Sequence, residues 1–495
     1  MEASLKAIGR VHETNRWFVL VLVCIAQFMV ILDATIVNVA LPSIQNGLHF
    51  STSNLQWIVN GYTLVFGGFL LLGGRASDLF GRQRLFIAGV IVFTAASLMN
   101  GVATSSGMLI GGRALQGFGA ALVSPAALSI VTTTFAEGAE RTKALGVWSA
   151  IAAGGSAVGL VLGGMLTEWL SWRWVFFINL PIGIVAALLS LRFVPNSRAE
   201  EKPDTADIAG AVSVTGGLLV LVYALVKAQS YGWGSGKTIG LGVLALALLV
   251  TFVLVELRSK APLIRLGIFK LRSLSGSNAA MLFVFSGLFA MFYFASLYLQ
   301  QVLGYGPLKA GFAFLPFTFG IVIGAGGAQQ LIQRIGIRTV TYIGLTLGVI
   351  GLALFTQLPT HGSYLVNVFP TIVIVSIGMG LAFVPLTLLA TTNVEDADAG
   401  LASGLFNTSQ QVGGALGLAV LSTLASSQTA RLTGGSGPVV SHGAALTSGF
   451  HVAFGVGALL LVGGIAMLLV TVRRSDVARI HTEDTAAEGA VPAAA

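Results

Sequence analysis

The chain has 495 residues, of which 55% are hydrophobic and only 9% are charged. A soluble globular protein carries charge on about a quarter of its residues, so this composition excludes a soluble domain and predicts a chain that mostly faces lipid. The net charge of +8 would favour a nucleic-acid partner in a soluble protein. Here the basic residues gather in the short segments between apolar runs, as in a membrane protein, and we expect no nucleic-acid partner.

Apolar runs of about 20 residues, the length that crosses a bilayer as a helix, recur along the whole chain. Charged residues, Gly and Pro divide them into fourteen predicted membrane-spanning helices. These lie near residues 17–41, 54–74, 85–104, 107–131, 144–167, 172–194, 207–227, 238–257, 274–302, 309–330, 339–358, 366–390, 402–424 and 448–472. The sequence therefore predicts an all-α polytopic membrane protein embedded in the lipid bilayer.

Lysine and arginine are distributed unevenly between the two sets of loops. With the N-terminus inside the cell, the cytoplasmic segments hold 21 of these residues and the outer segments hold 5. The positive-inside rule then predicts a multi-pass protein of the cell (plasma) membrane with both termini in the cytoplasm.

Glycines repeat at a nearly constant offset. Three recur 258 residues further along the chain: Gly146, Gly155 and Gly159 match Gly404, Gly413 and Gly417. The pair Gly117 and Gly119 matches the glycines at 378 and 380 at an offset of 261, and Gly81 matches Gly336 at 255. Three agreeing offsets imply two homologous halves.

Fourteen helices contain two equivalent halves only if the seventh and eighth helices are an insertion, which gives a 6+2+6 arrangement. The predicted parts are then a cytoplasmic N-terminal tail (1–16), an N-terminal six-helix bundle (17–194), cytoplasmic linkers with the two inserted helices (195–273), a C-terminal six-helix bundle (274–472) and a flexible cytoplasmic tail (473–495).

Two ionisable residues, Asp33 and Arg113, lie deep within predicted spans. Counted along their helices they sit about 12 and 9 Å below the outer membrane edge, so we expect them to form a pair. One interpretation is an ion pair that only locks two helices. The other is a proton carrier facing a central aqueous cavity, because burial favours the protonated acid whereas the guanidinium favours the ionised form. Gln116 and Asn38 are candidate hydrogen-bonding neighbours.

Glycines at 155, 159 and 163 recur every four residues and form a bare ridge on the fifth predicted helix. Gly320 and Gly324 have the same spacing on the tenth predicted helix. With Ala328 at the same spacing, this second ridge leads us to predict that the two helices, from opposite halves, cross at close range and slide as the halves rock. The alternative is static packing of each ridge within its own half or against lipid.

The stretch GGRASDLFGRQR, residues 73–84, separates the second and third predicted helices. Its arginines suit a cytoplasmic turn, but topology alone does not explain Asp78 or the flanking Gly74 and Gly81. These residues suggest a shaped turn rather than a random solvated loop.

Aromatic and amide side chains suit flat apolar drugs and cations, although an aromatic stripe is often packing or lipid-facing. On this basis the candidate substrate-binding residues are Asn38, Trp57, Asn60, Tyr62, Gln116, Phe289, Phe292, Tyr293 and Gln300.

The alternative of a membrane-embedded transferase would need a polar catalytic cluster. Five of the six histidines fall in tails or loops, and His451 lies near the end of the last helix. No base and nucleophile meet at membrane depth, so we predict no enzymatic activity. Asp33 is the single deep carboxylate, and we expect no metal site.

Four stretches carry a family resemblance. GGRASDLFGRQR resembles a loop signature of the major facilitator superfamily, LDATIVNVALPSI (32–44) and RALQGFGAA (113–121) resemble motifs of its first and fourth helices, and GLVLGG (159–164) resembles its antiporter motif. Leu79 and Leu160 depart from the usual arginine and proline. Over residues 17–472 the sequence is similar to the fourteen-helix drug:proton antiporters (EmrB/QacA type).

The resemblance implies a major facilitator fold of two pseudo-symmetric bundles and a proton-coupled multidrug or antibiotic exporter that works by alternating access. It implies small amphipathic or cationic drugs and protons as partners, no cofactor beyond the proton gradient, and a monomer. Asp33 and Arg113 would couple protons. The conformational gate would consist of Gly74, Asp78, Gly81 and Arg82, where Asp78 would meet the helix that starts near Gly400 and Glu137 would compete for Arg82. An exporter dedicated to one metabolite, such as a self-made antibiotic, an amino acid or a siderophore, remains an alternative.

Overall fold

The computed structural model describes residues 16–135, 139–194, 207–259, 262–391, 394, 399–434 and 441–472. Within these ranges every regular element is a helix. The first group comprises α2 (Arg16–Leu48), α3 (Thr52–Leu55), α4 (Trp57–Phe80), α5 (Arg82–Gly101), α6 (Ser106–Thr134), α7 (Ala139–Trp169), α8 (Trp174–Phe177) and α9 (Asn179–Phe193).

Two helices follow, α10 (Ile208–Tyr231) and α11 (Gly236–Arg258), and a short 3-10 helix η1 (Leu266–Lys270) leads to the last group. That group comprises α12 (Arg272–Leu297), the π-helical turn η2 (Tyr298–Val302), α13 (Pro307–Ala313), α14 (Leu315–Ile335), α15 (Ile337–Phe355), the π-helical turn η3 (Tyr364–Val368), α16 (Phe369–Thr391), α17 (Ala399–Gly434) and α18 (His442–Thr471).

Each of the fourteen predicted segments coincides with one long helix or with two consecutive ones. Among the described residues, 12 helical stretches are long and apolar enough to cross a membrane. The two remaining long helices, α7 of 31 residues and α17 of 36 residues, pack among those stretches. The predicted helical fold class is therefore confirmed.

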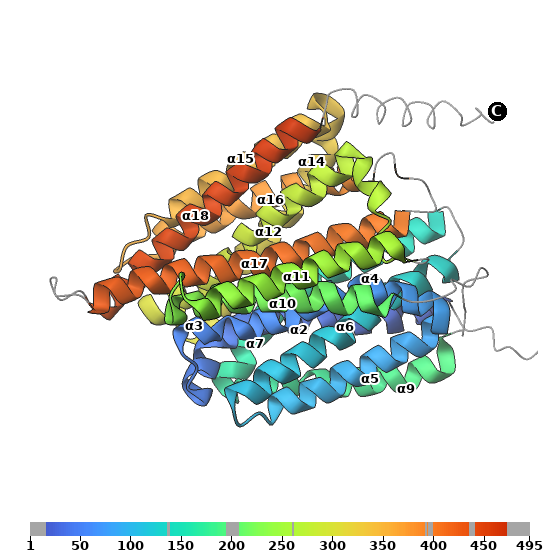
Figure 1. Cartoon of the computed structure of the whole chain (residues 1–495), viewed down its shortest axis with the longest axis horizontal. Coiled ribbons are helices and arrows are strands. Elements are labelled where there is room, and N and C mark those ends of the chain that lie inside the picture. The colour runs from blue at the N-terminus through green and yellow to red at the C-terminus, as the bar shows by residue number, and fades with distance from the viewer. Residues whose placement is uncertain are drawn as a thin grey trace, which may run out of the picture.

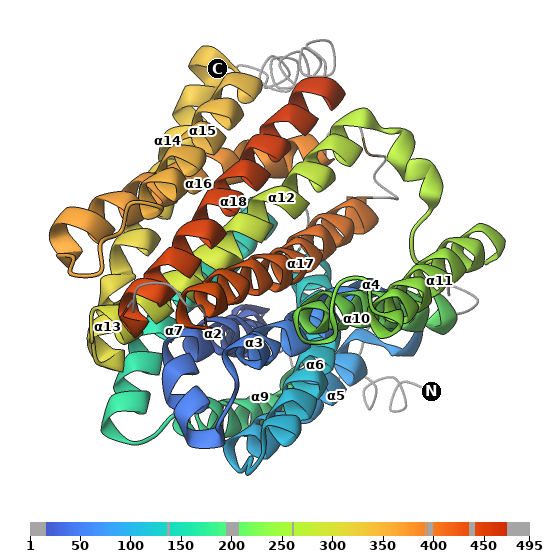
Figure 2. The ribbon, with the colours of Figure 1, turned by 60° about the vertical axis from the view of Figure 1, so that its left-hand side comes forward.

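The long helices assemble into two bundles that lie side by side (Figures 1 and 2). In the first bundle α6 packs between α4 and α5, and α2 packs against α7 and α9. In the second, α16 packs between α14 and α15, and α12 packs against α17 and α18. One bundle therefore consists of α2, α4, α5, α6, α7 and α9, and the other consists of α12 and α14 to α18.

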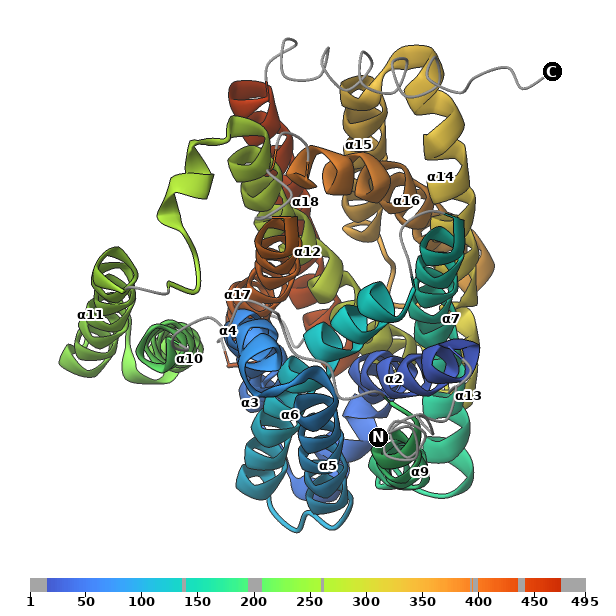
Figure 3. The same cartoon turned by 90° about the vertical axis from the view of Figure 1, so that its right-hand side faces the viewer.

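The turns at Gly81 and Gly336 occupy equivalent places in the two bundles. Gly81 joins α4 to α5 with φ 101°, and Gly336 joins α14 to α15 with φ 82°. Only glycine adopts such a backbone without strain. This match supports the predicted repeat. We call the end of the molecule that carries these two turns the basic end and the other the opposite end; Figure 3 views the basic end.

The pair α10 and α11 lies on one side of the two bundles, away from α7 (Figure 3). α10 contacts both α4 and α17, with Leu218 and Val222 packed in one cluster with Trp57, Leu64 and Ala415. By contrast, only 11% of the apolar window of α11 is buried. α10 therefore covers the seam between the bundles, and α11 is exposed on the outside of α10.

The fifth and tenth predicted helices do cross at close range, because a Cβ on Gly311 of α13 would lie directly against the Leu160 carbonyl oxygen of α7. The glycine ridge on α7 faces its own bundle instead, so the prediction that this ridge forms the crossing is wrong. A Cβ on Gly155 would lie 3.3 Å from the Phe28 ring, and one on Gly163 would lie 2.6 Å from the Ile36 carbonyl oxygen, both on α2. The ridge of Gly320 and Gly324 packs in the same way against α16. A spacing of four specifies a bare helical face but not the helix that covers it.

The match of Gly117 with Gly378 also needs correction. Gly117 packs against α4, at Tyr62 and Phe66, whereas Gly378 packs against α15, at Gly344 and Gly348. Each of the helices α6 and α16 lies between two neighbouring helices and carries two glycines, one facing each neighbour. On α6, Gly117 faces α4 and Gly119 faces α5, whereas on α16 Gly378 faces α15 and Gly380 faces α14. The repeat is genuine, but the offset of 261 pairs glycines that face different neighbours.

The bundles meet differently on their two sides. α4 and α17 touch toward the basic end, where a Cβ on Gly404 would lie 2.6 Å from Leu71 Cδ2. At the equivalent Gly146 of α7, a Cβ would meet no atom within 4 Å. α7 instead reaches the other bundle toward the opposite end, where a Cβ on Gly164 would lie 2.7 Å from Leu308 Cα of α13.

The ridge yields a stability prediction. Gly159→Leu inserts a side chain against Thr35 and the Leu32 backbone, so overpacking should destabilise the protein by about 1–3 kcal/mol. Gly154→Leu on the same helix is the matched control, because a Cβ there meets no atom within 4 Å. Thermal unfolding of both purified variants provides the measurement. Equal melting temperatures would contradict the close packing of α7 on α2.

Candidate functional site

Asp33 and Arg113 form an ion pair inside the N-terminal bundle. Asp33 lies on α2 with 0% of its surface exposed, and Arg113 lies on α6 with 1% exposed. Nη1 of Arg113 donates to Oδ2 of Asp33. The predicted pairing of these two residues is therefore confirmed.

Two amides complete the shell around the Asp33 carboxylate. Gln116 Nε2 donates to Oδ1 at 2.7 Å, and Asn179 Nδ2 donates to the same oxygen at 2.9 Å. Hydrogen bonds to a charged acceptor are stronger than neutral ones, and three donors stabilise the ionised carboxylate.

Gln116 connects this shell to a second layer of polar groups. Its Nε2 also donates to Ser97 Oγ at 2.7 Å, and its Oε1 accepts from Asn100 Nδ2 at 2.8 Å and from Arg113 Nη1 at 2.8 Å. Ser97 in turn accepts from Asn179 Nδ2 at 3.3 Å. A cooperative network of this kind orients every member of the cluster.

Arg113 is fixed on its other side by α4. Its Nε donates to the Ile58 carbonyl oxygen at 3.0 Å, and its guanidinium carbon lies 4.3 Å from the centre of the Tyr62 ring. Such a contact adds a cation–π attraction. The cluster thus joins α2, α4, α5, α6 and α9 at one point, and the predicted residues Asp33, Arg113, Gln116 and Tyr62 all belong to it.

The expectation that Asp33 faces a central aqueous cavity is wrong for the conformation described. All of its polar neighbours lie in its own bundle, and its side chain is completely buried. Chemically, the arrangement is a buried acid whose charge is balanced by one guanidinium.

Asn38 and Gln300 take part in a contact between the bundles. Ser296 Oγ of α12 donates to the Asn38 carbonyl oxygen at 2.8 Å, and Gln300 Nε2 donates to the Val39 carbonyl oxygen at 3.0 Å. Glu168 of α7 adds a carboxylate oxygen that accepts from the Leu308 N–H at 2.8 Å. These hydrogen bonds hold the bundles together toward the opposite end.

The other substrate candidates do not share one surface. Trp57 turns toward α10, where its ring lies 6.2 Å from that of Tyr223. Phe289 lies against Gly414 of α17, whereas the Phe292 ring is 4.6 Å from that of Phe317 on α14.

Asn60 and Tyr293 are buried polar side chains of a different kind. Asn60 is 0% exposed and Tyr293 is 2% exposed. Within the described part of the chain, neither the Asn60 amide nor the Tyr293 hydroxyl has a hydrogen-bond partner. A buried polar group without a hydrogen bond raises the free energy of the folded protein, so both side chains remain candidates for contact with a ligand or water.

The predicted gate is described only in part. Gly81 forms the turn and Gly400 lies in the first turn of α17, but the side chain of Asp78 and the whole of Glu137 lie outside what the structure describes. At Gly74 a Cβ would approach nothing closer than Pro125 Cβ at 3.7 Å. The tighter position is Gly73, which abuts the Ala121 backbone of α6.

Sequence reasoning missed Ser97, Asn100 and Asn179. Asn179 and Asn100 were visible as amides within apolar runs, FFINLP and SLMNG, and a polar residue inside a span is a functional signal. Ser97 carried no such signal, since a small hydroxyl residue is common in membrane helices.

Comparisons with known proteins agree with this geometry. The sequence profile of the Major Facilitator Superfamily matches residues 23–418. The chain is 41% identical over 469 residues to the puromycin resistance protein pur8 of Streptomyces alboniger, covering 93% of this chain and 92% of that protein. It is 40% identical to the cephamycin export protein CmcT of Amycolatopsis lactamdurans, covering 88% and 90%.

A solved structure shares the fold. A bacterial homolog of the human lysosomal transporter Spinster superposes with a TM-score of 0.63 at 17% identity, covering 93% of this chain and 97% of that one. The chain is thus a multi-pass membrane transporter rather than a membrane-embedded transferase. It belongs to the Major Facilitator Superfamily.

The cluster predicts unequal costs for removing one or both charges. Arg113→Met should destabilise the protein by about 3–5 kcal/mol, because Asp33 would remain buried without its counter-charge. Adding Asp33→Asn should restore most of that loss, since a neutral amide replaces the charge. Thermal unfolding of the single variants and the double variant measures this coupling. Additive losses would contradict the ion pair.

Proposed function

We propose that this chain is a proton-coupled exporter of antibiotics or other small amphipathic or cationic drugs, driven by the proton gradient without a cofactor. The observation that carries the proposal is the buried Asp33 with its single guanidinium partner. An ionisable residue inside a membrane span is costly and is retained in transporters as a proton relay. The names of the relatives, a puromycin resistance protein and a cephamycin exporter, support the substrate class.

We further propose that α7 and α17 also cross the membrane, which gives fourteen spans arranged 6+2+6 in the manner of the drug:proton antiporters. Both helices exceed the roughly 20 residues that a bilayer requires. Each packs along the first helix of its bundle, α7 on α2 and α17 on α12. With both termini in the cytoplasm of the cell membrane, the basic end is then the cytoplasmic face.

In the proposed cycle, the ion pair is the deprotonated state. It is reached when Asp33 releases its proton to the cytoplasm, and substrate then binds from that side. The bundles tilt, the hydrogen bonds at Asn38 and Glu168 break, and the substrate path opens at the opposite end. There a proton from outside neutralises Asp33, which removes the charge that holds Arg113 and releases the substrate.

The loop motif has a place in this cycle. α4 and α17 run antiparallel, with Gly67 beside Gln411 and Leu71 beside Gly404. Asp78 follows Leu71 by about two helical turns, which brings its backbone toward Ala399, where α17 begins. A carboxylate is favoured at a helix N-terminus. We therefore propose that Asp78 latches the cytoplasmic side of this seam.

The proton gradient supplies enough free energy for this work. One charge that crosses ~150 mV releases about 3.5 kcal/mol. For a neutral substrate exchanged one for one, this sustains a ~300-fold concentration gradient.

A dedicated exporter of a single self-made antibiotic is the second candidate. The names of both reported relatives refer to one antibiotic each, which favours a narrow substrate range. Efflux assays with a panel of antibiotics separate the two candidates, because a dedicated exporter would transport one chemical class.

Asp33→Asn tests proton coupling. We expect the variant to insert normally and to exchange substrate down its gradient, but to lose uphill efflux, since an amide cannot carry the proton. Dye and antibiotic efflux from energised cells is the measurement. Glu140→Gln, which removes an exposed carboxylate paired with Arg16, is the control and should transport normally. Full uphill efflux by Asp33→Asn would reject Asp33 as the proton carrier.

A cross-link tests alternating access. Cys24 is the single native cysteine, so Cys24→Ala provides a clean background. In it, Gln45→Cys together with Gln301→Cys places thiols where α2 meets η2 at the opposite end, since Gln301 Nε2 donates to Gln45 Oε1 at 2.9 Å. A bifunctional thiosulfonate cross-linker should abolish transport and reduction should restore it, because the bundles could no longer part at this end. Each single cysteine variant is a control, and transport unaffected by a completed cross-link would refute this opening.

A further inference from the structure

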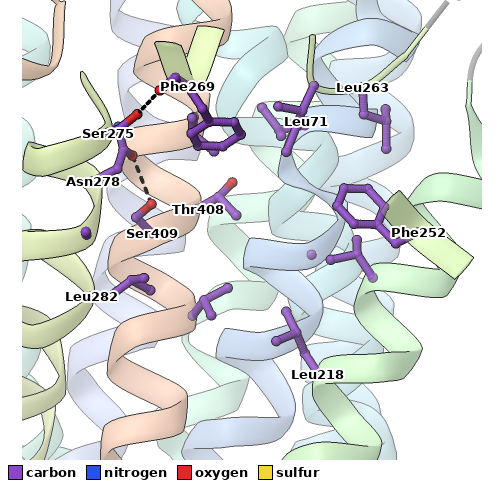
Figure 4. A pocket seen from close by; sticks show the side chains of 16 residues that line it. Leu71, Leu218, Phe252, Leu263, Phe269, Ser275, Asn278, Leu282, Thr408 and Ser409 are labelled. Carbon is purple, nitrogen blue, oxygen red and sulfur yellow. Dashed lines mark hydrogen bonds between the residues drawn. The ribbon is translucent and has the colours of Figure 1, made fainter. Parts of the chain in front are cut away.

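A cavity of about 420 Å³ lies between the inserted helices, the C-terminal bundle and α4, which contributes Gly68 and Leu71 to its wall. Figure 4 shows its walls, with Leu218 and Phe252 on the inserted side, Leu282 on the other, and Leu263 and Phe269 of the linker at one end. The cavity is separate from the Asp33 cluster, which lies among α2, α4, α5, α6 and α9.

The polar side chains in the wall have partners within the protein. Ser275 Oγ donates to the Phe269 carbonyl oxygen at 2.7 Å, and Asn278 Oδ1 accepts from Ser409 Oγ at 2.9 Å (Figure 4). Asn278 Nδ2 donates to the Leu274 carbonyl oxygen at 2.8 Å. Because these groups already satisfy one another, the cavity offers a ligand an almost wholly apolar surface, which suits hydrocarbon.

The position of the cavity determines what surrounds it. α10, α11 and α12 are each apolar and long enough to span the membrane. α11 is exposed along most of its length, so lipid chains cover the inserted pair from outside. In a bilayer, an apolar cavity at this depth meets acyl chains before it meets any solute from water.

The linker at the end of the cavity is basic. It carries Arg258, Arg265, Lys270 and Arg272, all with exposed side chains. Among the described residues, the acids nearby are Asp207 and Glu256, which are buried at 8% and 4% exposure. Glu256 Oε2 accepts the Ile264 N–H at 3.1 Å and so ties the linker to α11 beside the cavity. The exposed charge that the described residues place around this end is therefore positive.

We propose that this cavity holds an acyl chain of an anionic phospholipid, whose phosphate lies on the basic side chains of the linker. The apolar wall selects hydrocarbon, and the positive linker selects an anionic headgroup over a zwitterionic one. The bound lipid would fill the space between α10 and the α12–α17 pair, beside the seam of α4 and α17. The inference is independent of the exported substrate.

Photolabelling of the full-length protein in nanodiscs tests the site. The probe is phosphatidylglycerol with a diazirine on one acyl chain, compared with phosphatidylcholine carrying the same chains. We expect the phosphatidylglycerol probe to label the segments 214–218 and 275–282 several-fold more strongly. Equal labelling by both probes, or labelling confined to other helices, would overturn the proposal.

Two variants with matched controls distinguish the contribution of the lipid headgroup to binding from that of the acyl chain. Lys270→Gln should lower the preference for phosphatidylglycerol by about fivefold, the effect of one basic side chain near the surface. Lys237→Gln is the control, an exposed lysine at the other end of the same helix pair. Ala279→Phe should fill the cavity and abolish labelling, whereas Ala247→Phe on the exposed face of α11 should not.

Competition identifies the occupant. Unlabelled phosphatidylglycerol should displace the probe, and an exported dye or antibiotic should not. Displacement by the drug but not by lipid would overturn the proposal and assign the cavity to the substrate path. Labelling of wild-type protein is sufficient to decide this point, so the test does not depend on folding of any variant.

Discussion

A buried negative charge inside a bundle of apolar helices is the constraint on which the rest of the structure depends. Asp33 is tolerated at membrane depth because α6 and α9 bring Arg113, Gln116 and Asn179 to it. An acid left alone there would be strongly unfavourable. The approach of these helices is therefore determined by the hydrogen bonds and the ion pair that the carboxylate requires as much as by apolar packing.

The sequence predicted this site in outline. Asp33 and Arg113 were found because charge is rare in apolar runs and their calculated depths agreed. Gln116 and Tyr62 were named as well, but Asn179 and Ser97 were not, because the partners of an acid depend on which helices are neighbours. Helical spacing defines a face, and the three-dimensional arrangement assigns the helix opposite it. The prediction for the ridge of Gly155 and Gly163 was wrong for that reason, because the ridge packs against α2 and not against α14.

The repeat illustrates the same limit. Gly81 and Gly336 share a backbone conformation that chemistry imposes, and this equivalence was readable from residue type and offset alone. Gly117 and Gly378 also matched by type, yet they touch different neighbours. The aromatic residues of α12 were the least predictable, since rings at Phe289 and Phe292 pack equally well against helices on different sides.

The contact of α10 with both bundles has a mechanical consequence. A helix attached to α4 on one flank and to α17 on the other limits how far these two can separate. For the proposed alternating access, we therefore expect unequal movement, with the α4–α17 side as the pivot and the larger displacement on the α7–α14 side. In that proposal α10 and α11 restrict the separation of the bundles to one flank.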